Sequence, residues 1–289
     1  MKRLRVTHST GYRYGGEVSA SYNEARMLPA SGARQLVLHS ALDVEPVSSH
    51  HQYTDYWGTR VLAFDVLNPH RELTLTATSL VEVLDAEHDA VHGGEHAPGP
   101  LGWEAFAEAV ARSGECVQQL RQTPLTEPPA SLVALAASVA GGAGDPCTVA
   151  HAIAAAIGEA MTYESGVTGV RTTAREAWEA RGGVCQDIAH VAIGALRSAG
   201  IPARYVSGYL HPKADAAVGE TVVGESHAWV EWFCGGWHGY DPTNGVGIGD
   251  RHVRVGHGRD YADVAPLRGV YSGAAGSELF VSVSITREA

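Results

Sequence analysis

The sequence has few cysteines and no spacing that would pair them. Its four cysteines, Cys116, Cys147, Cys185 and Cys234, are far apart, and no C-x-x-C pair occurs. This excludes a small disulfide-stabilised scaffold and is typical of a reduced, cytoplasmic protein. A reducing compartment would also keep a reactive thiol free. We therefore expect reduced cysteines and a cytoplasmic location.

Basic residues and long apolar runs are also scarce. The chain has 21 Lys and Arg against 32 Asp and Glu, a formal net charge of -11. Nucleic acids and anionic membranes both require a basic surface, so neither is expected as the main partner. No window approaches the roughly 18 apolar residues that a membrane helix needs, and residues 1–14 lack the apolar core of a signal peptide.

The composition is that of a folded protein, with 45% hydrophobic and 18% charged residues in a chain of 289. That length allows one large domain or two smaller ones. Residues 73–78 alternate apolar and polar side chains, as a half-buried strand does, and residues 36–44 and 60–66 are similar. We predict a β-rich N-terminal domain over residues 1–85.

Residues 86–145 are expected to form a linker and a helical lead-in. Residues 88–102 are rich in Gly, His and Pro, and Ala-rich stretches favour helices over 103–112, 131–140 and 148–161. Residues 146–289 are predicted to be the catalytic core. Strands are expected at 203–210, 225–233, 237–241 and 279–285, with a loop at 211–224.

Cys185 stands at the predicted start of an amphipathic helix. Apolar residues occupy positions 188, 191, 192, 195 and 196, which is the i, i+3, i+4, i+7, i+8 pattern of one helix face. Gly200 is placed to end this helix. The free amides and positive dipole of a helix start favour a thiolate and can stabilise an oxyanion. Gly182 and Gly183 permit unusual backbone angles and leave room for a substrate. The alternative is a cysteine that packs as a small hydrophobe.

His227 and Asp241 are predicted to share one face of a β-hairpin. If residues 234–236 form the loop, Phe233 pairs with Trp237, and His227 becomes a diagonal neighbour of Asp241, about 7–8 Å away at most between Cβ atoms. The imidazole can then bond the carboxylate and take a proton from a thiol. A register slip of one residue would separate the pair. The alternatives are an ordinary cross-strand histidine and an aspartate that begins a turn before proline.

Four sequence blocks resemble the core of bacterial transglutaminase-like proteins, a group often described as cysteine proteases. They occur in the family's order and are GVCQDIAH at 183–190, GIPARYVSGYL at 200–210, ESHAWVE at 225–231 and DPTN at 241–244. Residues 258–267 resemble the family's C-terminal segment, and residues 1–85 its N-terminal domain.

The resemblance implies an α+β fold with a papain-like core, in which the cysteine-bearing helix packs on an antiparallel sheet. It places the nucleophile at Cys185, its histidine at His227 and its aspartate at Asp241. We expect thiol-dependent acyl transfer on peptide or carboxamide bonds, with hydrolysis favoured because water is always present, and with no cofactor. The alternatives are a cross-linking transglutaminase, a non-catalytic binding module, and a zinc protein that uses these three side chains as ligands.

Several other side chains are candidates for the site. Tyr163 and Trp178 could donate to an oxyanion or wall the cleft, although a core or rim role is the simpler interpretation of both. Trp229, a further cleft candidate, shares the predicted face of His227 and could shield the imidazole from water. Asp187 is expected to interact with the helix dipole, and His190 to be structural.

Overall fold

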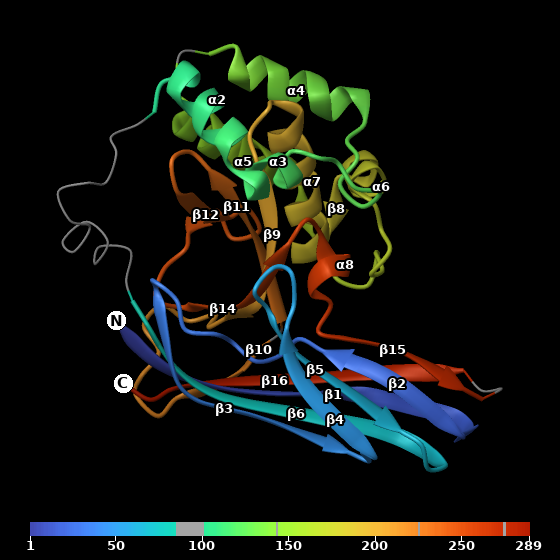
Figure 1. The fold of residues 1–289 in the computed structure, drawn as a ribbon. Coiled ribbons are helices and arrows are strands. Elements are labelled where there is room, and N and C mark those ends of the chain that lie inside the picture. Colours follow the sequence, from blue (N-terminus) through green and yellow to red (C-terminus); the bar gives the residue numbers. More distant parts are fainter. Residues whose placement is uncertain (85–100, 143, 225, 274–275) are drawn as a thin grey trace.

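A computed structural model of the protein describes residues 1–84, 101–142, 144–224, 226–273 and 276–289. The helices gather at one end of the molecule and two β-sheets lie at the other (Figure 1). The predicted α+β class is therefore confirmed. Most of the predicted linker at 88–102 lies outside the described residues. Within the described part of the chain, no helix is long and apolar enough to cross a membrane.

The N-terminal region is a sandwich of two antiparallel sheets. One has the strand order β10-β16-β1-β6-β3 and the other the order β15-β2-β5-β4. Buried and part-exposed residues alternate along most of β6, so its apolar face points into the sandwich. The strands are β1 (Lys2–Val18), β2 (Ala20–Ala25), β3 (Gln35–Glu45), β4 (Ser49–Thr54), β5 (Arg60–Val66), β6 (His70–Val83), β10 (Thr221–Gly224), β15 (Leu267–Ser272) and β16 (Ser277–Arg287).

The C-terminal strands belong to these N-terminal sheets, which corrects the predicted boundaries. β16 pairs with β1 and β15 with β2, so the predicted core at 146–289 is not one contiguous structural unit. The predicted loop at 211–224 contains β10, which pairs with β16. Both chain ends lie side by side (Figure 1), where the Arg3 amide donates to the Ala289 carbonyl at 3.1 Å. A strand pattern alone does not say which distant strand will be its partner.

A third sheet has the order β13-β12-β11-β9-β14. We call it the catalytic layer because it carries His227 and Asp241, for which a catalytic role is predicted. Its strands are β9 (Ala203–Leu210), β11 (Ser226–Phe233), β12 (Trp237–Asp241), β13 (Val246–Gly247) and β14 (His252–Gly258). The described helices are α2 (Trp103–Arg112), α3 (Gly114–Gln119), α4 (Ala130–Ala140), α5 (Pro146–Ala160), α6 (Ala174–Ala180), α7 (Cys185–Ser198) and α8 (Tyr261–Val264). Helix α7 packs on β9 and β11 and is surrounded by α4, α5 and α6.

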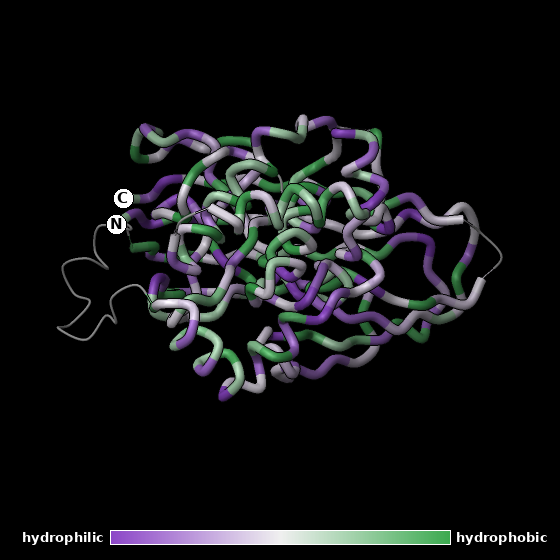
Figure 2. The backbone as a smooth tube through the Cα atoms, turned by 90° about the horizontal axis from the view of Figure 1, so that it is seen from above, coloured by the Kyte–Doolittle hydropathy of each residue, from purple (hydrophilic) through white to green (hydrophobic). Residues whose placement is uncertain are grey.

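A second core joins the catalytic sheet to the sandwich. Val253 and Tyr209 of the catalytic sheet meet Leu4, Val81 and Ile285 of the first N-terminal sheet, and all five are buried. The first N-terminal sheet therefore packs on both the second sheet and the catalytic layer. Apolar and polar segments alternate along the described part of the trace (Figure 2). This packing fixes where the sandwich stands relative to the cysteine-bearing helix.

Arg197 ties the end of α7 to four other segments. Arg197 is 5% exposed, and its guanidinium donates to the carbonyls of Gln119, Ala203 and Arg259, at 2.8 to 3.2 Å, and to the Thr126 hydroxyl at 3.1 Å. Burial lowers the pKa of Arg197 to about 10, so the group stays charged at neutral pH. A buried cation with this many acceptors is a structural clamp, because removing it takes a donor away from each of them.

Candidate active site

Cys185 is the first residue of α7, as predicted, and its side chain is partly exposed. Asp187 fixes this helix start. Its Oδ2 accepts from the Val184 amide at 2.9 Å and from the Thr168 hydroxyl at 2.6 Å. Burial raises the pKa of Asp187, although both donors oppose that rise. The amide of Cys185 lies in the first turn, where a helix leaves N–H groups without intrahelical acceptors.

Gly183 makes room for Asp187 and not for a substrate, contrary to our expectation. A Cβ at this position would lie 2.7 Å from both Cβ and Oδ2 of Asp187, and its φ of 156° is one that L side chains rarely adopt. Gly182 and Gly183 are both buried and form β8 (Gly182–Gly183), which pairs in parallel with β7 (Thr162–Tyr163). This pairing brings Tyr163 next to the cysteine.

Gly183→Ala is expected to lower the free energy of unfolding by about 2–3 kcal/mol, because the new methyl group displaces the capping carboxylate. Fast alkylation of Cys185 should be lost with it. The matched control is Gly182→Ala, whose Cβ would lie 3.3 Å from the flexible end of Glu164. It should cost less than about 1 kcal/mol. Urea denaturation followed by circular dichroism measures both, and equal losses for the two variants would contradict this account.

The hairpin has the predicted register. Phe233 pairs with Trp237, and the Nε2 atom of His227 lies 2.7 Å from Oδ2 of Asp241. The side chain of His227 is 10% exposed and that of Asp241 is fully buried. Because Nε2 faces the carboxylate, Nδ1 is left to face the thiol.

Asp241 is surrounded by donors. Its Oδ1 accepts from the amides of Thr243 at 3.0 Å and Asn244 at 3.2 Å, and its Oδ2 accepts from Asn244 Nδ2 at 2.7 Å. Burial alone would raise the pKa of Asp241, but the hydrogen bond to His227, the nearby ring of His252 and the hydrogen bond from Asn244 hold it well below its usual range. The carboxylate is therefore ionised throughout the neutral range, despite its burial.

His252 is a second histidine on this carboxylate. Its Nδ1 accepts from the Gly249 amide at 3.2 Å, so in the neutral ring the proton is on Nε2, which lies 3.5 Å from Oδ2 of Asp241. Burial lowers the pKa of His252, which keeps that ring neutral. His252 therefore lies close to Asp241 without competing with His227 for positive charge, and its Nε2 makes no hydrogen bond within the described part of the chain.

Cys185 and His227 line the same two cavities, and the thiol is close enough to influence the imidazole. Burial opposes the charged imidazole, but interactions with Asp241 and Cys185 outweigh burial and raise the pKa of His227 to about 9. The structure thus brings together the three residues predicted from sequence, in the order thiol, imidazole, carboxylate. This arrangement favours the protonated imidazole of His227 at neutral pH.

Loss of this imidazolium should be visible in the pH dependence of stability. A raised pKa in the folded state stabilises it fully below about pH 6.5, and that contribution disappears as the pH rises through 9. The difference in unfolding free energy between wild type and His227→Gln should therefore fall by about 3 kcal/mol between pH 6 and pH 10. Urea denaturation at a series of pH values measures it. A difference that is constant with pH would show that His227 is not held as a cation.

The thiol and imidazole stand between two adjoining cavities, of about 690 and 380 Å³. Val281 and Val283 of β16 and Gly224 of β10 line both, so the N-terminal sheet forms one wall of the cleft. Leu210, Thr243 and Asn244 line the larger cavity, whereas Tyr205, Tyr261 and Leu267 line the smaller one. An extended substrate could lie across the thiol with a part in each cavity.

The three aromatic residues that were candidates for the cleft lie in different places. Tyr163 lines both cavities, as proposed for a cleft residue. Trp178 does not reach the cleft; it is 3% exposed, and its Nε1 donates to the Ser131 hydroxyl at 3.0 Å. Trp229 is buried behind the triad, with its ring centroid 6.3 Å from that of His227. Trp178 and Trp229 are thus core residues and not cleft walls, and Trp229 shields the imidazole from behind.

One feature of the site region was not found from the sequence, and another was predicted wrongly. His252 follows no motif, and no local signal could have placed it on Asp241. The expectation of reduced cysteines is wrong for one pair, because Cys147 and Cys234 form a disulfide across 87 residues, while Cys116 and Cys185 are free. Their pairing depends on how α5 packs beside the hairpin, which spacing cannot show. The cytoplasmic location stays a prediction.

Comparison with known proteins agrees with this geometry. Residues 4–82 match the bacterial transglutaminase-like N-terminal region, and residues 133–242 match the transglutaminase-like superfamily. An uncharacterized protein of Mycobacterium leprae is 43% identical, with 99% of each chain covered. An uncharacterized protein of Mycobacterium tuberculosis is 34% identical, with 98% of this chain and 92% of that protein covered. The chain therefore belongs to the transglutaminase-like superfamily and carries the N-terminal region of its bacterial members.

A solved structure supports the fold over the whole chain. It is that of a "putative cysteine protease" from Cytophaga hutchinsonii, with a TM-score of 0.73, 22% identity, and coverage of 99% of this chain and 97% of that one. At this identity the likeness concerns the fold.

Proposed function

We propose that the protein is a thiol-dependent acyl-transfer enzyme that hydrolyses peptide or carboxamide bonds. The observation that carries this proposal is that Cys185 and His227 line the same two cavities, while Nε2 of the imidazole is 2.7 Å from a buried carboxylate. In a hydrolase of this design, the Cys185 thiolate attacks the carbonyl carbon and His227 protonates the leaving amine. Asp241 holds the ring and stabilises its cationic form.

The remaining parts of the site have roles in the same reaction. The Cys185 amide, in the first turn of α7, is a donor for the oxyanion of the tetrahedral intermediate. Water then attacks the thioester carbonyl, with His227 as the general base, and the acid is released with the thiol restored. The apolar wall of Val281 and Val283 fits a peptide substrate that carries apolar side chains near the reacting bond. No cofactor takes part in this chemistry.

Two measurements test the proposal. The first is the rate at which iodoacetamide alkylates Cys185 at pH 7, read by mass spectrometry, with the free and buried Cys116 as an internal reference. An enzyme requires much faster labelling at Cys185. Labelling no faster than at Cys116 would favour a binding module that has lost turnover.

The second measurement separates hydrolysis from cross-linking. A library of fluorogenic peptide amides is incubated with wild type and with Cys185→Ala, with and without a fluorescent primary amine. Release of the acid product that requires Cys185 supports the hydrolase. Incorporation of the amine in place of water would assign a transglutaminase, and release that survives in Cys185→Ala would refute the thiol mechanism.

A further inference from the structure

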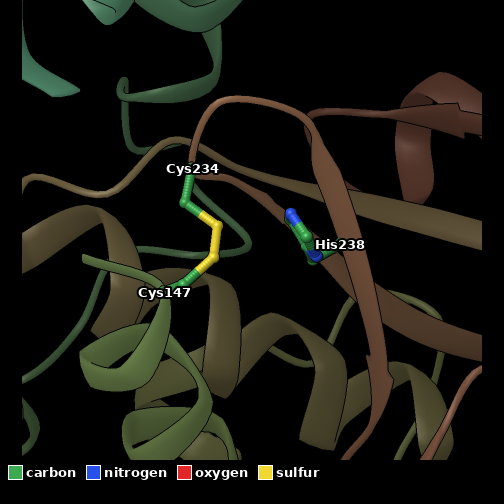
Figure 3. Close-up of side chains that lie close together, drawn as sticks. All are labelled: Cys147, Cys234 and His238. Carbon is green, nitrogen blue, oxygen red and sulfur yellow. A yellow bond between two sulfur atoms is a disulfide. The ribbon is translucent and has the colours of Figure 1, made fainter. Parts of the chain in front are cut away.

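A second group of reactive side chains lies on the catalytic layer, apart from the triad. Among the described residues, Cys147, Cys234 and His238 place one ligand atom each within 4.8 Å of one another (Figure 3). They come from three elements: the first turn of α5, the turn after β11, and β12. Cys234 is buried, Cys147 is partly exposed and His238 is exposed. The group is therefore held by the fold and is also accessible from solvent.

The backbone around the two cysteines is well fixed. Asp145 caps α5 by accepting from the Cys147 amide at 2.9 Å, and Pro146 occupies the first turn. The Cys234 amide donates to the Gly236 carbonyl at 3.0 Å, which closes the hairpin turn. The two Cα atoms are 5.5 Å apart, a separation usual for bridged cysteines. A helix start also favours the thiolate form of Cys147 once the bridge is open.

We propose that Cys147, Cys234 and His238 form a redox-gated zinc site: a disulfide in the oxidised protein, and a Cys₂His zinc site in the reduced protein. A dithiol reductant supplies two electrons and two protons, the S–S bond breaks, and the reductant leaves as its own disulfide. Zn²⁺ then displaces the two thiol protons and forms two Zn–S bonds and one Zn–N bond to the neutral imidazole of His238. Water completes the tetrahedron.

The chemistry of this donor set selects zinc. Two thiolates and one imidazole are soft or borderline ligands, which suit Zn²⁺ and exclude Mg²⁺ and Ca²⁺. Two thiolates also balance the charge of the ion. Three protein ligands leave a fourth position open to solvent, in keeping with the exposure of His238.

The redox state of Cys147 and Cys234 determines how the hairpin is connected to helix α5. Cys234 and His238 belong to the hairpin whose strands carry His227 and Asp241, whereas Cys147 belongs to α5, which packs on the cysteine-bearing helix α7. Both the disulfide and the zinc ion connect the hairpin to α5. The reduced, metal-free protein has neither connection. The inference does not depend on the proposed acyl-transfer activity.

Cobalt binding tests the site directly. The full chain carrying Cys185→Ala, which removes the other thiol beside a histidine, is reduced with dithiothreitol, desalted without oxygen and titrated with Co²⁺. We expect the visible absorption of tetrahedral thiolate-bound cobalt to saturate at one ion per chain and to vanish when Zn²⁺ is added. The oxidised protein should show none. A reduced protein without this absorption, or an oxidised protein with it, would overturn the proposal.

Variants of the three proposed ligands, Cys147, Cys234 and His238, test whether they cause the cobalt absorption. Cys147→Ser and Cys234→Ser should abolish it, and His238→Ala, an exposed change that is safe for folding, should weaken binding at least tenfold. The matched control is His151→Ala, an exposed histidine one turn after Cys147 and outside the group. Cys116→Ser is the control for the cysteines. Binding unchanged in His238→Ala, or weakened equally in His151→Ala, would refute the assignment.

Discussion

Replacing Asp241 with asparagine is expected to slow alkylation of Cys185 at pH 6.5 by about 100-fold, and to lower kcat on an acyl substrate by about 10³- to 10⁴-fold. Oδ1 of Asp241 accepts two backbone amides, so the asparagine carbonyl must take that place and its NH₂ group must face His227. Nε2 of the imidazole then becomes an acceptor. Its proton moves to Nδ1, which can no longer receive a proton from the thiol.

The pH profile of alkylation distinguishes this effect from simple misfolding. Wild type and Asp241→Asn should converge in alkaline solution, where the thiol ionises without help from the imidazole. Asn244→Ala is the control, because it removes one neutral donor to Asp241 and should cost no more than about tenfold. If folded Asp241→Asn is alkylated as fast as wild type at pH 6.5, the carboxylate does not hold the imidazolium.

Replacing Arg197 with methionine is expected to lower the free energy of unfolding by about 3–5 kcal/mol. Methionine fills similar space but leaves the carbonyls of Gln119, Ala203 and Arg259 without their donor in a buried site. Such a loss is a large part of the 5–15 kcal/mol by which native proteins are stable.

The matched control for Arg197 is Arg112→Met. Arg112 is exposed and pairs with Glu108 one turn earlier on α2, so its loss should cost less than about 0.5 kcal/mol. Urea denaturation measures both variants against wild type. A value for Arg197→Met within 1 kcal/mol of wild type would mean that water or rearranged side chains satisfy the three carbonyls.

The helix start at Cys185 and the pairing of His227 with Asp241 could be predicted because each depends only on residues that are near one another in the sequence. The apolar stripe after Cys185 sets a helix start, and a three-residue turn sets the register of the hairpin that carries His227 and Asp241. Neither inference needs knowledge of distant packing. The four ordered sequence blocks then supplied the contact between the helix and the hairpin, which periodicity alone did not.

The features that could not be predicted all depend on contacts between distant segments. β10 is a strand because β16 lies beside it, and the cleft wall of Val281 and Val283 exists because β16 joins β1. Trp178 enters the helical core because Ser131 accepts its N–H there. Sequence pattern gives each residue a preference for burial or exposure but does not name the neighbour that it will meet.

The strand β16 has a consequence for the order in which the cleft is completed during synthesis. It follows every other element of the cleft in the sequence, yet it lies between β10 and β1 in the sheet. A nascent chain can therefore bring the thiol, imidazole and carboxylate together before this wall exists. The wall of Val281 and Val283 is added only when β16 has been synthesised and inserted between β10 and β1.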